Sequence, residues 1–359
     1  MKTLIFIDHG TVLGGAQLVL VNYLKYFDKK KFRCVVICSG DNPNVISRFE
    51  QFADKVYSVP FERLKINSPL ALFRFVKSVI AVINIIYLEG GDTLLLNTER
   101  AVYVGTVAGI ITGTKIVWFI RDFCYNRFLL NLLSRFSSKI YFVSSAIKKF
   151  YSGNVLQKGE VLFVSSDMNK KVEGVSKKDV NQFKKSLGIT NEFVAGYIGR
   201  LAEWKGYKVL ETAALEHFQG SLVCLIVGDA PSKKVLYSKN RKVRVIYTGF
   251  IDRVELVLSV LDTFVHPAVE PEPYATGLVE AMQARVPVIA TNLGGTPEII
   301  QNMKTGILVE PNDPKIISEK IKLLSGDKEL CDSISRLAYA QVTKHNMIGD
   351  EVKRIESLL

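Results

Sequence analysis

The sequence predicts an α/β protein made of two doubly wound, parallel-sheet domains that face a cleft. Short apolar runs of strand length alternate with segments of helical period along the chain, a pattern typical of parallel sheets covered by helices. A chain of 359 residues is too long for one compact core and suits two domains. A polar, lysine-rich stretch near the middle supplies the boundary between them.

The first half begins with a buried strand and a glycine-containing turn. The first apolar run stops at Asp8 and His9, so we expect no secretory signal. Gly14 and Gly15 then open a helix that continues to about Phe27, where they either let the backbone approach a ligand or form a tight turn. The strand candidates of this half are 3–7, 34–38, 55–59, 93–97, 115–120 and 139–143.

Two later segments of the first half combine basic and apolar residues at helical spacing. They are 70–88 and 127–139. Most amphipathic helices cover a core, but such helices can also lie in a membrane interface. We favour the membrane interpretation because both segments fall in the most basic part of the chain. We expect no membrane-spanning segment, because the longest apolar run, 79–88, has about half the ~20 residues that a crossing requires.

The net charge of +12 is concentrated in the first half of the chain. Residues 1–180 hold 25 Lys and Arg against 14 Asp and Glu, and in 101–150 the only acidic residue is Asp122. This excess predicts an anionic partner, either a membrane surface, a phosphorylated acceptor or a nucleic acid, unless it is only a solvated face. The chain lacks the interleaved aromatic and basic residues of a nucleic-acid module, so we expect no nucleic acid.

The cysteines and histidines do not have metal-ligand spacing. Five cysteines and four histidines are scattered along the chain. We expect buried free thiols in a reducing cytoplasm, no metal and no resident cofactor.

The domain boundaries follow from the polar stretch 167–188. We expect a first domain of residues 1–170, to which a C-terminal helix of about 342–359 crosses back. Residues 171–190 form a hinge and 191–341 the second domain. The strand candidates of the second half are 193–199, 221–227, 243–247, 263–266 and 288–290.

Two carboxylates occur eight positions apart in the stretch HPAVEPEPYATGLVEAM at 266–282. Prolines place Glu272 on a loop, and Glu280 lies in the first turns of a helix whose N-cap we expect to be Thr276. The amides of 277–279 would then form a phosphate site at the helix N-terminus. The alternative is that both acids only complement the helix dipole.

Two cations follow the first strand of the second domain. Arg200 can bind a diphosphate bidentately, and Lys205 acts as a point charge. A diphosphate between two hydroxyl-binding carboxylates, Glu272 and Glu280, is the chemistry of a sugar nucleotide.

At this point the ordered motifs resemble those of the retaining glycosyltransferases of GT-B fold, which have two Rossmann-like domains, and within them glycosyltransferase family 4 (glycosyl transferases group 1). The resemblance covers nearly the whole chain, and the two glutamates with seven residues between them are its hallmark. The motifs are GGAQ at 14–17, YIGRLAEWKG at 197–206, IVGD at 226–229, EPYATGLVEAM at 272–282, NLGGTPEII at 292–300 and TGILVEPND at 305–313.

The resemblance implies a donor bound in the cleft between the domains. Arg200 and Lys205 would neutralise the leaving diphosphate without a metal, Glu280 would hold the ribose and Glu272 the donor sugar near the reacting carbon. The remaining implied donor contacts involve mainly backbone groups: Tyr274, Ala275, Thr276 and Gly277 for sugar and phosphate, Gly14 and Gly15 for the diphosphate, Phe250 and Ile251 for the base.

The chain departs from the family pattern at three positions. Ala275 stands where glycine is usual, and Gln17 where an acid is usual. Phe119 aligns with a histidine that often orients the donor sugar. Arg121 and Asp122 are the candidates on the acceptor side that would take over that work.

The implied reaction is retaining transfer of a hexose-type sugar from a nucleotide diphosphate-sugar, such as a UDP- or GDP-sugar, to an acceptor hydroxyl. With the basic first half, it predicts a lipid-linked or cell-surface glycan acceptor and a cytoplasmic enzyme peripheral to the inner face of the cell membrane. The alternatives are a sugar-nucleotide epimerase of GT-B fold and a non-catalytic sugar-nucleotide binding protein.

Overall fold

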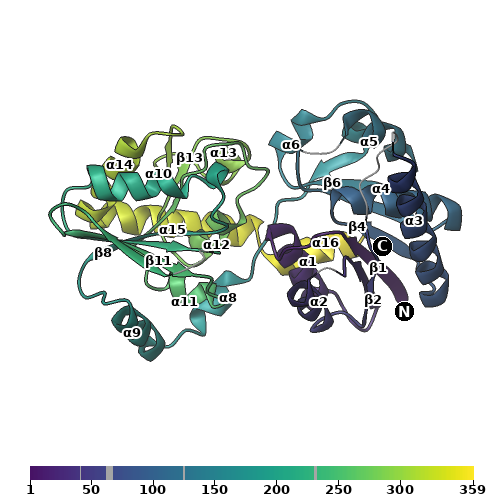
Figure 1. The fold of residues 1–359 in the computed structure, drawn as a ribbon, viewed down its shortest axis with the longest axis horizontal. Coiled ribbons are helices and arrows are strands. Elements are labelled where there is room, and N and C mark those ends of the chain that lie inside the picture. Colours follow the sequence, from purple (N-terminus) through teal and green to yellow (C-terminus); the bar gives the residue numbers. More distant parts are fainter. Residues whose placement is uncertain (41, 62–67, 124–125, 230–232) are drawn as a thin grey trace. The chain divides into compact units, whose positions relative to one another are not determined.

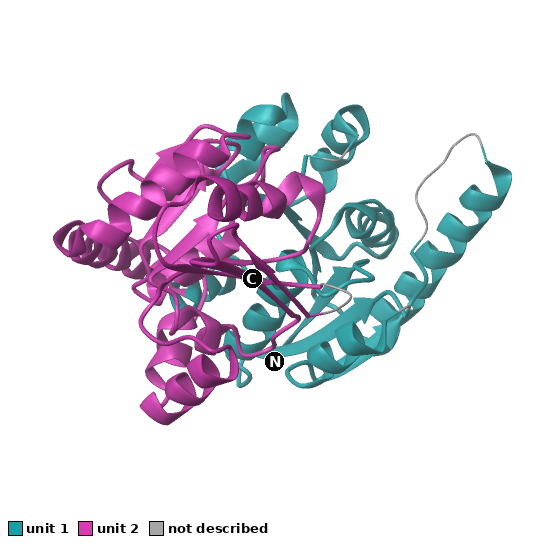
Figure 2. Ribbon diagram, turned by 60° about the vertical axis from the view of Figure 1, so that its left-hand side comes forward, with its two compact units in different colours: residues 1–164, 348–359 teal, residues 165–347 magenta. Residues whose placement is uncertain are grey.

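The computed structural model describes residues 1–40, 42–61, 68–123, 126–229 and 233–359. The chain divides into two compact units, coloured separately in Figure 2. The first contains Met1–Val164 and Ile348–Leu359, and the second contains Ser165–Met347. Each has one seven-stranded sheet covered by helices, so the predicted fold class is confirmed. Residues 171–190 lie within the second unit, and their function as a hinge stays a prediction.

The sheet of the first unit is parallel throughout, in the order β3-β2-β1-β4-β5-β6-β7. All six predicted strands are present. The strand β7 was not predicted, because it has only three residues; it pairs with β6 at the sheet edge. The strands are β1 Lys2–Asp8, β2 Phe32–Cys38, β3 Lys55–Ser58, β4 Thr93–Leu96, β5 Lys115–Ile120, β6 Lys139–Phe142 and β7 Gly159–Val161.

The helices of the first unit include one that differs from the prediction. The segment 127–139 is not a single helix: the seven-residue α5 ends at Leu133, a 3-10 turn follows, and Lys139 begins β6, where it pairs with Glu160 at 2.7 Å. The helices are α1 Gly15–Tyr26, α2 Pro43–Glu50, α3 Pro69–Glu89, α4 Glu99–Thr112, α5 Arg127–Leu133, α6 Ser145–Phe150, α7 Asn154–Lys158 and α16 Ile348–Glu356.

The sheet of the second unit has the order β10-β11-β9-β8-β12-β13-β14, and only β10 is antiparallel. The five predicted strands are present, whereas β10 and β14 were missed. Both are short edge strands: β10 is largely exposed, and β14 is buried but has only three residues. The strands are β8 Phe193–Ile198, β9 Leu222–Val227, β10 Lys234–Tyr237, β11 Val243–Gly249, β12 Thr263–His266, β13 Val288–Thr291 and β14 Ile307–Val309.

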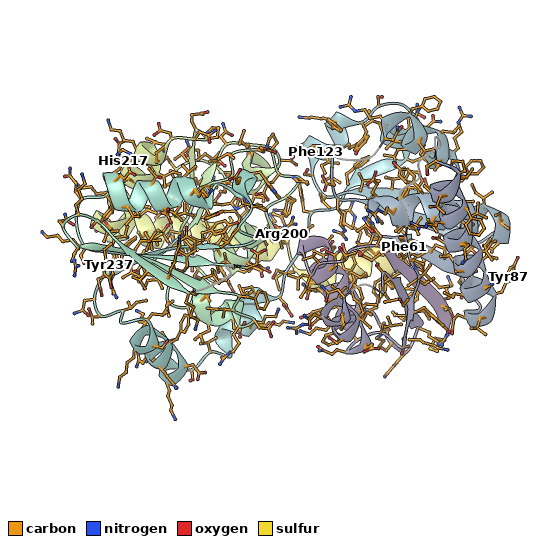
Figure 3. The ribbon with its side chains drawn as sticks, viewed as in Figure 1. Phe61, Tyr87, Phe123, Arg200, His217 and Tyr237 are labelled. Carbon is orange, nitrogen blue, oxygen red and sulfur yellow. The ribbon has the colours of Figure 1, made fainter. Side chains whose placement is uncertain are left out.

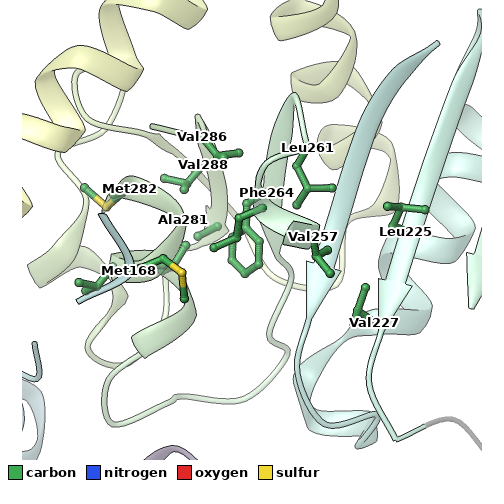
Figure 4. Close-up of a cluster of buried hydrophobic side chains, with 14 of the residues drawn as sticks. Met168, Leu225, Val227, Val257, Leu261, Phe264, Ala281, Met282, Val286 and Val288 are labelled. Carbon is green, nitrogen blue, oxygen red and sulfur yellow. The ribbon is translucent and has the colours of Figure 1, made fainter. Parts of the chain in front are cut away.

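Helices cover both faces of the second sheet and enclose two cores (Figure 1). Alternate residues of β9 pack into the two cores. Val223, Leu225 and Val227 lie in one, and Cys224 and Ile226 lie in the other. Figure 4 shows the first core, beneath α12. The helices are α8 Met168–Glu173, α9 Lys177–Ser186, α10 Tyr207–Thr212, α11 Val254–Leu258, α12 Thr276–Gln283, α13 Thr296–Ile299, α14 Pro314–Gly326 and α15 Lys328–His345.

The cysteines within the described residues are free thiols. Burial raises the pKa of Cys34 to about 11 and the pKa values of Cys38 and Cys224 to about 12, so these thiols are unreactive at neutral pH. Cys331 is also free, and Cys124 lies outside the described residues.

Each sheet has one position at which the strand order reverses. In the first sheet it lies between β1 and β4, and in the second it lies between β8 and β12. Ligands of open parallel sheets bind beyond the carboxyl ends of strands at such a switch point. In the second unit, the loops at this point are 199–206 and 267–275, which contain the predicted cations and Glu272.

Candidate active site

A buried carboxylate links the two loops at the switch point of the second sheet. Lys205, in the loop after β8, donates from Nζ to Glu272 Oε2 at 2.5 Å. The other carboxylate oxygen, Oε1, lies 3.0 Å from Nε2 of His266, the last residue of β12. Glu272 and His266 are almost fully buried, and the Lys205 side chain is 18% exposed. The structure thus brings together two of the three predicted catalytic residues.

The environment of Glu272 keeps it ionised. Burial alone would raise the pKa of its carboxyl group, but His266 and Lys205 more than offset this effect and lower the pKa to about 2. Because the folded-state pKa lies below the ordinary carboxyl value, the interaction stabilises the fold at neutral pH. That stabilisation is lost as the pH falls toward 2.

Glycines allow the backbones around Glu272 to approach closely. Gly206 has φ +71°, and a Cβ there would lie 1.8 Å from the carbonyl oxygen of Pro267. Gly294 has φ +57°, and a Cβ would lie 2.2 Å from the carbonyl oxygen of Glu272, to which Gly295 N donates at 2.8 Å. The motif NLGGTPEII therefore supports the backbone of Glu272. Gly206 allows the loop that contains Lys205 to pack directly against the loop that contains Glu272.

The second predicted cation, Arg200, is exposed at the end of β8 (Figure 3). Its guanidinium carbon lies 5.8 Å from the ring centroid of Trp204, and Lys205 Nζ lies 4.4 Å from the same ring. No carboxylate pairs with Arg200 among the residues that the structure describes. The loop is fixed by Asp229 of the IVGD motif, whose Oδ1 accepts a hydrogen bond from Leu201 N at 2.7 Å. Arg200 is thus a cation on a fixed loop with its charge available to a ligand.

The start of α12 differs from the prediction. The N-cap is Ala275, not Thr276, which is the first helical residue, and no side chain caps the helix. Leu278 N donates to Ala275 O at 3.0 Å, and Thr276 N to Tyr274 O at 3.2 Å. The expected trio of free amides at 277–279 was therefore wrong for Leu278, because the first turn is tightened by 3-10-type bonds.

Glu280 lies on α12 in different surroundings from Glu272. Burial raises its pKa to about 7; Lys171 on α8 lowers the pKa and Asp167, the N-cap of α8, raises it, both by smaller amounts. Asp167 and Lys171 pair with each other at 3.2 Å. The two glutamates thus differ: Glu272 is ionised at neutral pH, whereas the pKa of Glu280 is raised into the neutral range.

The remaining predicted donor residues lie on loops at the carboxyl edge of the same sheet. Tyr274 accepts a hydrogen bond at its hydroxyl from Asn346 Nδ2 at 2.8 Å. Phe250 directly follows β11 and is 71% exposed, whereas Ile251 packs against the core beneath α12. These positions suit base and sugar contacts, and their roles stay predictions.

In the first unit, the glycine turn after β1 is fixed by a buried aspartate. Asp8 Oδ1 accepts from Gly10 N at 2.6 Å and from Gln17 Nε2 at 2.9 Å, while Gln17 Oε1 accepts from Gly14 N at 3.2 Å. Gly15 is the first residue of α1. The departure at Gln17 thus has a physical reason: its amide donates to Asp8, whereas an ionised glutamate would repel it.

Phe119 and Arg121 form the other distinctive part of the first unit. Phe119 is buried and stacks on Tyr141, so it is a core residue. Arg121 Nε donates to Asn97 Oδ1 at 2.7 Å, Nη2 donates to the Tyr23 hydroxyl at 3.3 Å, and the guanidinium carbon lies 5.2 Å from the Phe119 ring centroid.

Asp122 is exposed and accepts from Phe123 N at 2.7 Å. Of the two acceptor-side candidates, Arg121 is therefore the one held by a hydrogen-bond network.

Sequence reasoning assigned no role to three residues of these networks. His266 is the polar end of an apolar strand. Asp8 likewise ends β1, and Asn97 directly follows β4. A polar residue at the carboxyl end of a parallel strand next to a switch point was the available signal. No group of three or more His, Cys, Asp or Glu side chains within the described ranges is arranged to hold a metal ion.

Comparison with known proteins shows a family similarity within the second unit. Residues 179–341 match the family model "Glycosyl transferases group 1". The chain is 24% identical over 335 residues to the capsular polysaccharide biosynthesis glycosyltransferase CapM of Staphylococcus aureus, covering 86% of this chain and 84% of the relative. It is 32% identical over 160 residues to N-acetyl-alpha-D-glucosaminyl L-malate synthase of Bacillus anthracis, covering 43% and 42% of the two chains.

Solved structures extend the similarity to the whole chain. HepE of Anabaena, in complex with UDP and glucose, superposes with a TM-score of 0.83 at 23% identity and covers 99% of both chains. WaaG, a glycosyltransferase involved in lipopolysaccharide biosynthesis, has a TM-score of 0.66 at 16% identity with the same coverage. The chain has the GT-B fold. Residues 179–341 are similar to the glycosyl transferases group 1 family, and this similarity supports a transferase.

The buried pairing of Glu272 leads to a stability prediction. Glu272→Gln should lower the free energy of unfolding at pH 7 by about 3 kcal/mol, because Lys205 loses its buried ionic partner. The difference in the free energy of unfolding between this variant and wild type should become smaller as the pH falls toward 2. Urea unfolding followed by circular dichroism measures it. Glu270→Gln, two residues earlier but exposed, is the control, and equal effects of the two substitutions would contradict the role of Glu272.

Proposed function

We propose that this protein is a retaining glycosyltransferase that needs no metal. It transfers a sugar from a nucleotide diphosphate-sugar, a UDP- or GDP-sugar, to a hydroxyl of a lipid-linked or cell-surface glycan. The observation that carries the proposal is the 2.5 Å pair between Lys205 and Glu272 at the switch point between β8 and β12. A fixed cation and a fixed anion there match the charge pattern of a sugar nucleotide, with its anionic diphosphate and its hydroxyl-rich sugar.

The cations act on the leaving group. As the bond between the sugar and the diphosphate breaks, negative charge develops on the diphosphate and positive charge on the sugar ring. Arg200 and Lys205 stabilise the first, and because their loop is already fixed, little reorganisation accompanies the reaction. Glu272 holds Lys205 in place and presents a carboxylate to the sugar. The positive charge of Arg200 and Lys205 takes the place of the metal ion that other transferases use.

The rest of the donor extends along the same sheet edge. Glu280 accepts hydrogen bonds from the ribose hydroxyls, and the segment from Tyr274 to Gly277 contacts the sugar and phosphate. Phe250 and Ile251 hold the base, and Gly14 and Gly15 of the first unit bind the diphosphate. Support for a uridine nucleotide comes from HepE, of similar fold, whose crystal structure contains UDP.

Retention at the anomeric carbon rests on the resemblance of the two-glutamate series to retaining enzymes. Proton NMR of the newly formed linkage tests it directly. Incubation with the donor alone separates the alternatives: an epimerase would change the sugar nucleotide, and a non-catalytic binding protein would bind it without turnover.

The acceptor is proposed to lie at a membrane surface, with the enzyme peripheral to its cytoplasmic face. Among the described residues, α3 is the one helix long and apolar enough to cross a membrane, but it is the crossover helix between β3 and β4. Its outer side remains apolar, and Tyr87 extends from its end in Figure 3. The exposed apolar residues of α3 are Leu70, Leu72, Phe73, Val76, Ile80, Tyr87 and Leu88.

The charge of this region fits an anionic lipid surface. Arg74 and Lys77 are exposed on the same helix, and α5, in the basic segment 101–150, exposes Arg127 and Phe128. Apolar residues next to cations are the composition of an interfacial helix. Arg121 is proposed to bind an anionic or hydroxyl group of the acceptor, with Asp122 beside it.

The leaving-group role of the cations predicts a large rate effect. Arg200→Ala and Lys205→Ala should each lower kcat by a factor on the order of 10²–10³, the loss typical of one preorganised charge-stabilising group. Release of the nucleoside diphosphate during transfer measures this rate. Lys208→Ala, an exposed lysine paired with Glu203, is the matched control and should leave the rate unchanged. Arg200→Ala breaks no ion pair among the residues that the structure describes, so full turnover by this variant would contradict the proposal.

The pKa of Glu280 predicts a pH-dependent donor affinity. An ionised carboxylate can accept hydrogen bonds from both ribose hydroxyls, so binding selects the ionised form. Because the pKa is about 7, affinity should be highest above pH 7 and fall by up to about tenfold per unit below it. Calorimetry with UDP-glucose tests this, since its diphosphate diester carries no titrating proton near pH 7. Glu280→Gln should bind more weakly than wild type above pH 7 and without this dependence. A pH-independent wild type would argue against the ribose role.

The membrane proposal predicts binding to anionic vesicles. Wild type should sediment with phosphatidylglycerol vesicles at low salt, and Phe73→Gln/Ile80→Gln should reduce the bound fraction at least about tenfold, because two apolar side chains no longer insert. Val235→Gln/Tyr237→Gln, which changes two exposed apolar residues of the second unit, is the control. A wild type that stays in solution, or equal binding by both double variants, would contradict the proposal.

A further inference from the structure

A buried glutamine joins the helix of the donor site to two distant chain segments. Gln283, the last residue of α12, is 2% exposed. Its Nε2 donates to the carbonyl oxygens of Ser166 at 3.1 Å and Asn346 at 3.0 Å, and its Oε1 accepts from Met168 N at 3.0 Å. Both amide hydrogens and the amide oxygen are therefore used.

These segments are where the chain passes between the two units. The first crossing follows Val164 and the second follows Met347, so Ser166 and Asn346 each lie within two residues of a crossing. The two segments also contact each other: Ser166 N donates to Asn346 O at 3.4 Å, and Ser166 forms a parallel bridge with Met347. One side chain thus binds the backbones of both crossings.

A second connection runs from the same segment to the carboxylate loop. The Asn346 side chain donates to the Tyr274 hydroxyl at 2.8 Å. Tyr274 lies between Glu272 and the start of α12. The second crossing is therefore connected to both ends of the segment 274–283.

The helix between these connections is short and firmly packed. Ala281, Met282 and Phe264 lie in one buried cluster with Met168, the first residue of α8 (Figure 4). Glu280 precedes Gln283 by about one helical turn. A shift of Glu280 toward a ligand must therefore be accompanied by a shift of the hydrogen bonds of Gln283.

We propose that Gln283 is a positioning residue that couples occupancy of the nucleotide-sugar site to the conformation of both crossing segments. The inference rests on the proposed function, because the ligand is the donor assigned there. A buried amide with three satisfied hydrogen bonds favours one arrangement of its partners. Binding at Glu280 and Tyr274 would stabilise that arrangement, and by reciprocity the arrangement strengthens binding. Methionine could fill the same volume but could not select the arrangement.

Hydrogen exchange of the wild-type protein gives the first test. Saturating UDP-glucose should slow exchange of the backbone amides in 165–168 and 346–347 by a factor of about 5 or more, besides those at the start of α12, since typical couplings lie between about 5-fold and 150-fold. Binding that protects α12 but leaves the crossing segments unchanged would overturn the inference while the proposed function stands. If UDP-glucose, GDP-glucose and UDP do not bind, the proposed function fails and this inference fails with it.

Two matched variants complete the test. In Gln283→Met, UDP-glucose should still slow amide exchange at the start of α12 but should no longer slow it in the crossing segments. The Kd of this variant for UDP-glucose should rise by a factor of about 5 or more. Gln341→Met is the control, because Gln341 binds the carbonyl oxygen of Ile299 elsewhere in the second unit. It should retain both effects. A Gln283→Met protein that binds with wild-type affinity and wild-type protection at the crossings would show a merely structural role.

Discussion

The carboxylate of Glu272 is the group on which the site of the second unit depends. It is buried between the ammonium of Lys205 and the imidazole of His266, and these two come from the loop after β8 and the end of β12. A buried carboxylate without such partners would be neutral. The backbone around it is equally constrained, because Gly206 and Gly294 allow contacts that any side chain would prevent. The fold therefore fixes a cation and an anion side by side before any ligand binds.

The two glutamates of the series have different electrostatic environments and hence different capacities. Glu272 contacts the Lys205 ammonium and the His266 imidazole, whereas Glu280 faces Lys171 and Asp167, which largely neutralise each other. One carboxylate is therefore charged at neutral pH and suited to positioning Lys205. The other exchanges its proton near neutral pH and can adapt its hydrogen bonding to a diol. The eight-residue spacing alone does not reveal this division, which follows from burial and from the residues of α8.

Much of the architecture could be predicted from the sequence because apolar runs mark buried parallel strands. The failures were local: β10 is an exposed edge strand, β14 is an edge strand of only three residues, and 127–139 has helical spacing although its end forms a strand. At the site, motif order indicated Arg200, Lys205 and Glu272, but not His266, since its proximity to Glu272 depends on the register of β12. Thr276 was a plausible cap by residue type, yet the tightened first turn makes Ala275 the N-cap.

A crystal structure of the protein with UDP-glucose is the most direct test of this site. The diphosphate should lie within hydrogen-bond distance of Arg200 and Lys205, with the ribose hydroxyls on Glu280 and the glucose beside Glu272. A nucleotide bound elsewhere, or one whose diphosphate contacts neither cation while Lys205 remains paired only with Glu272, would contradict this prediction.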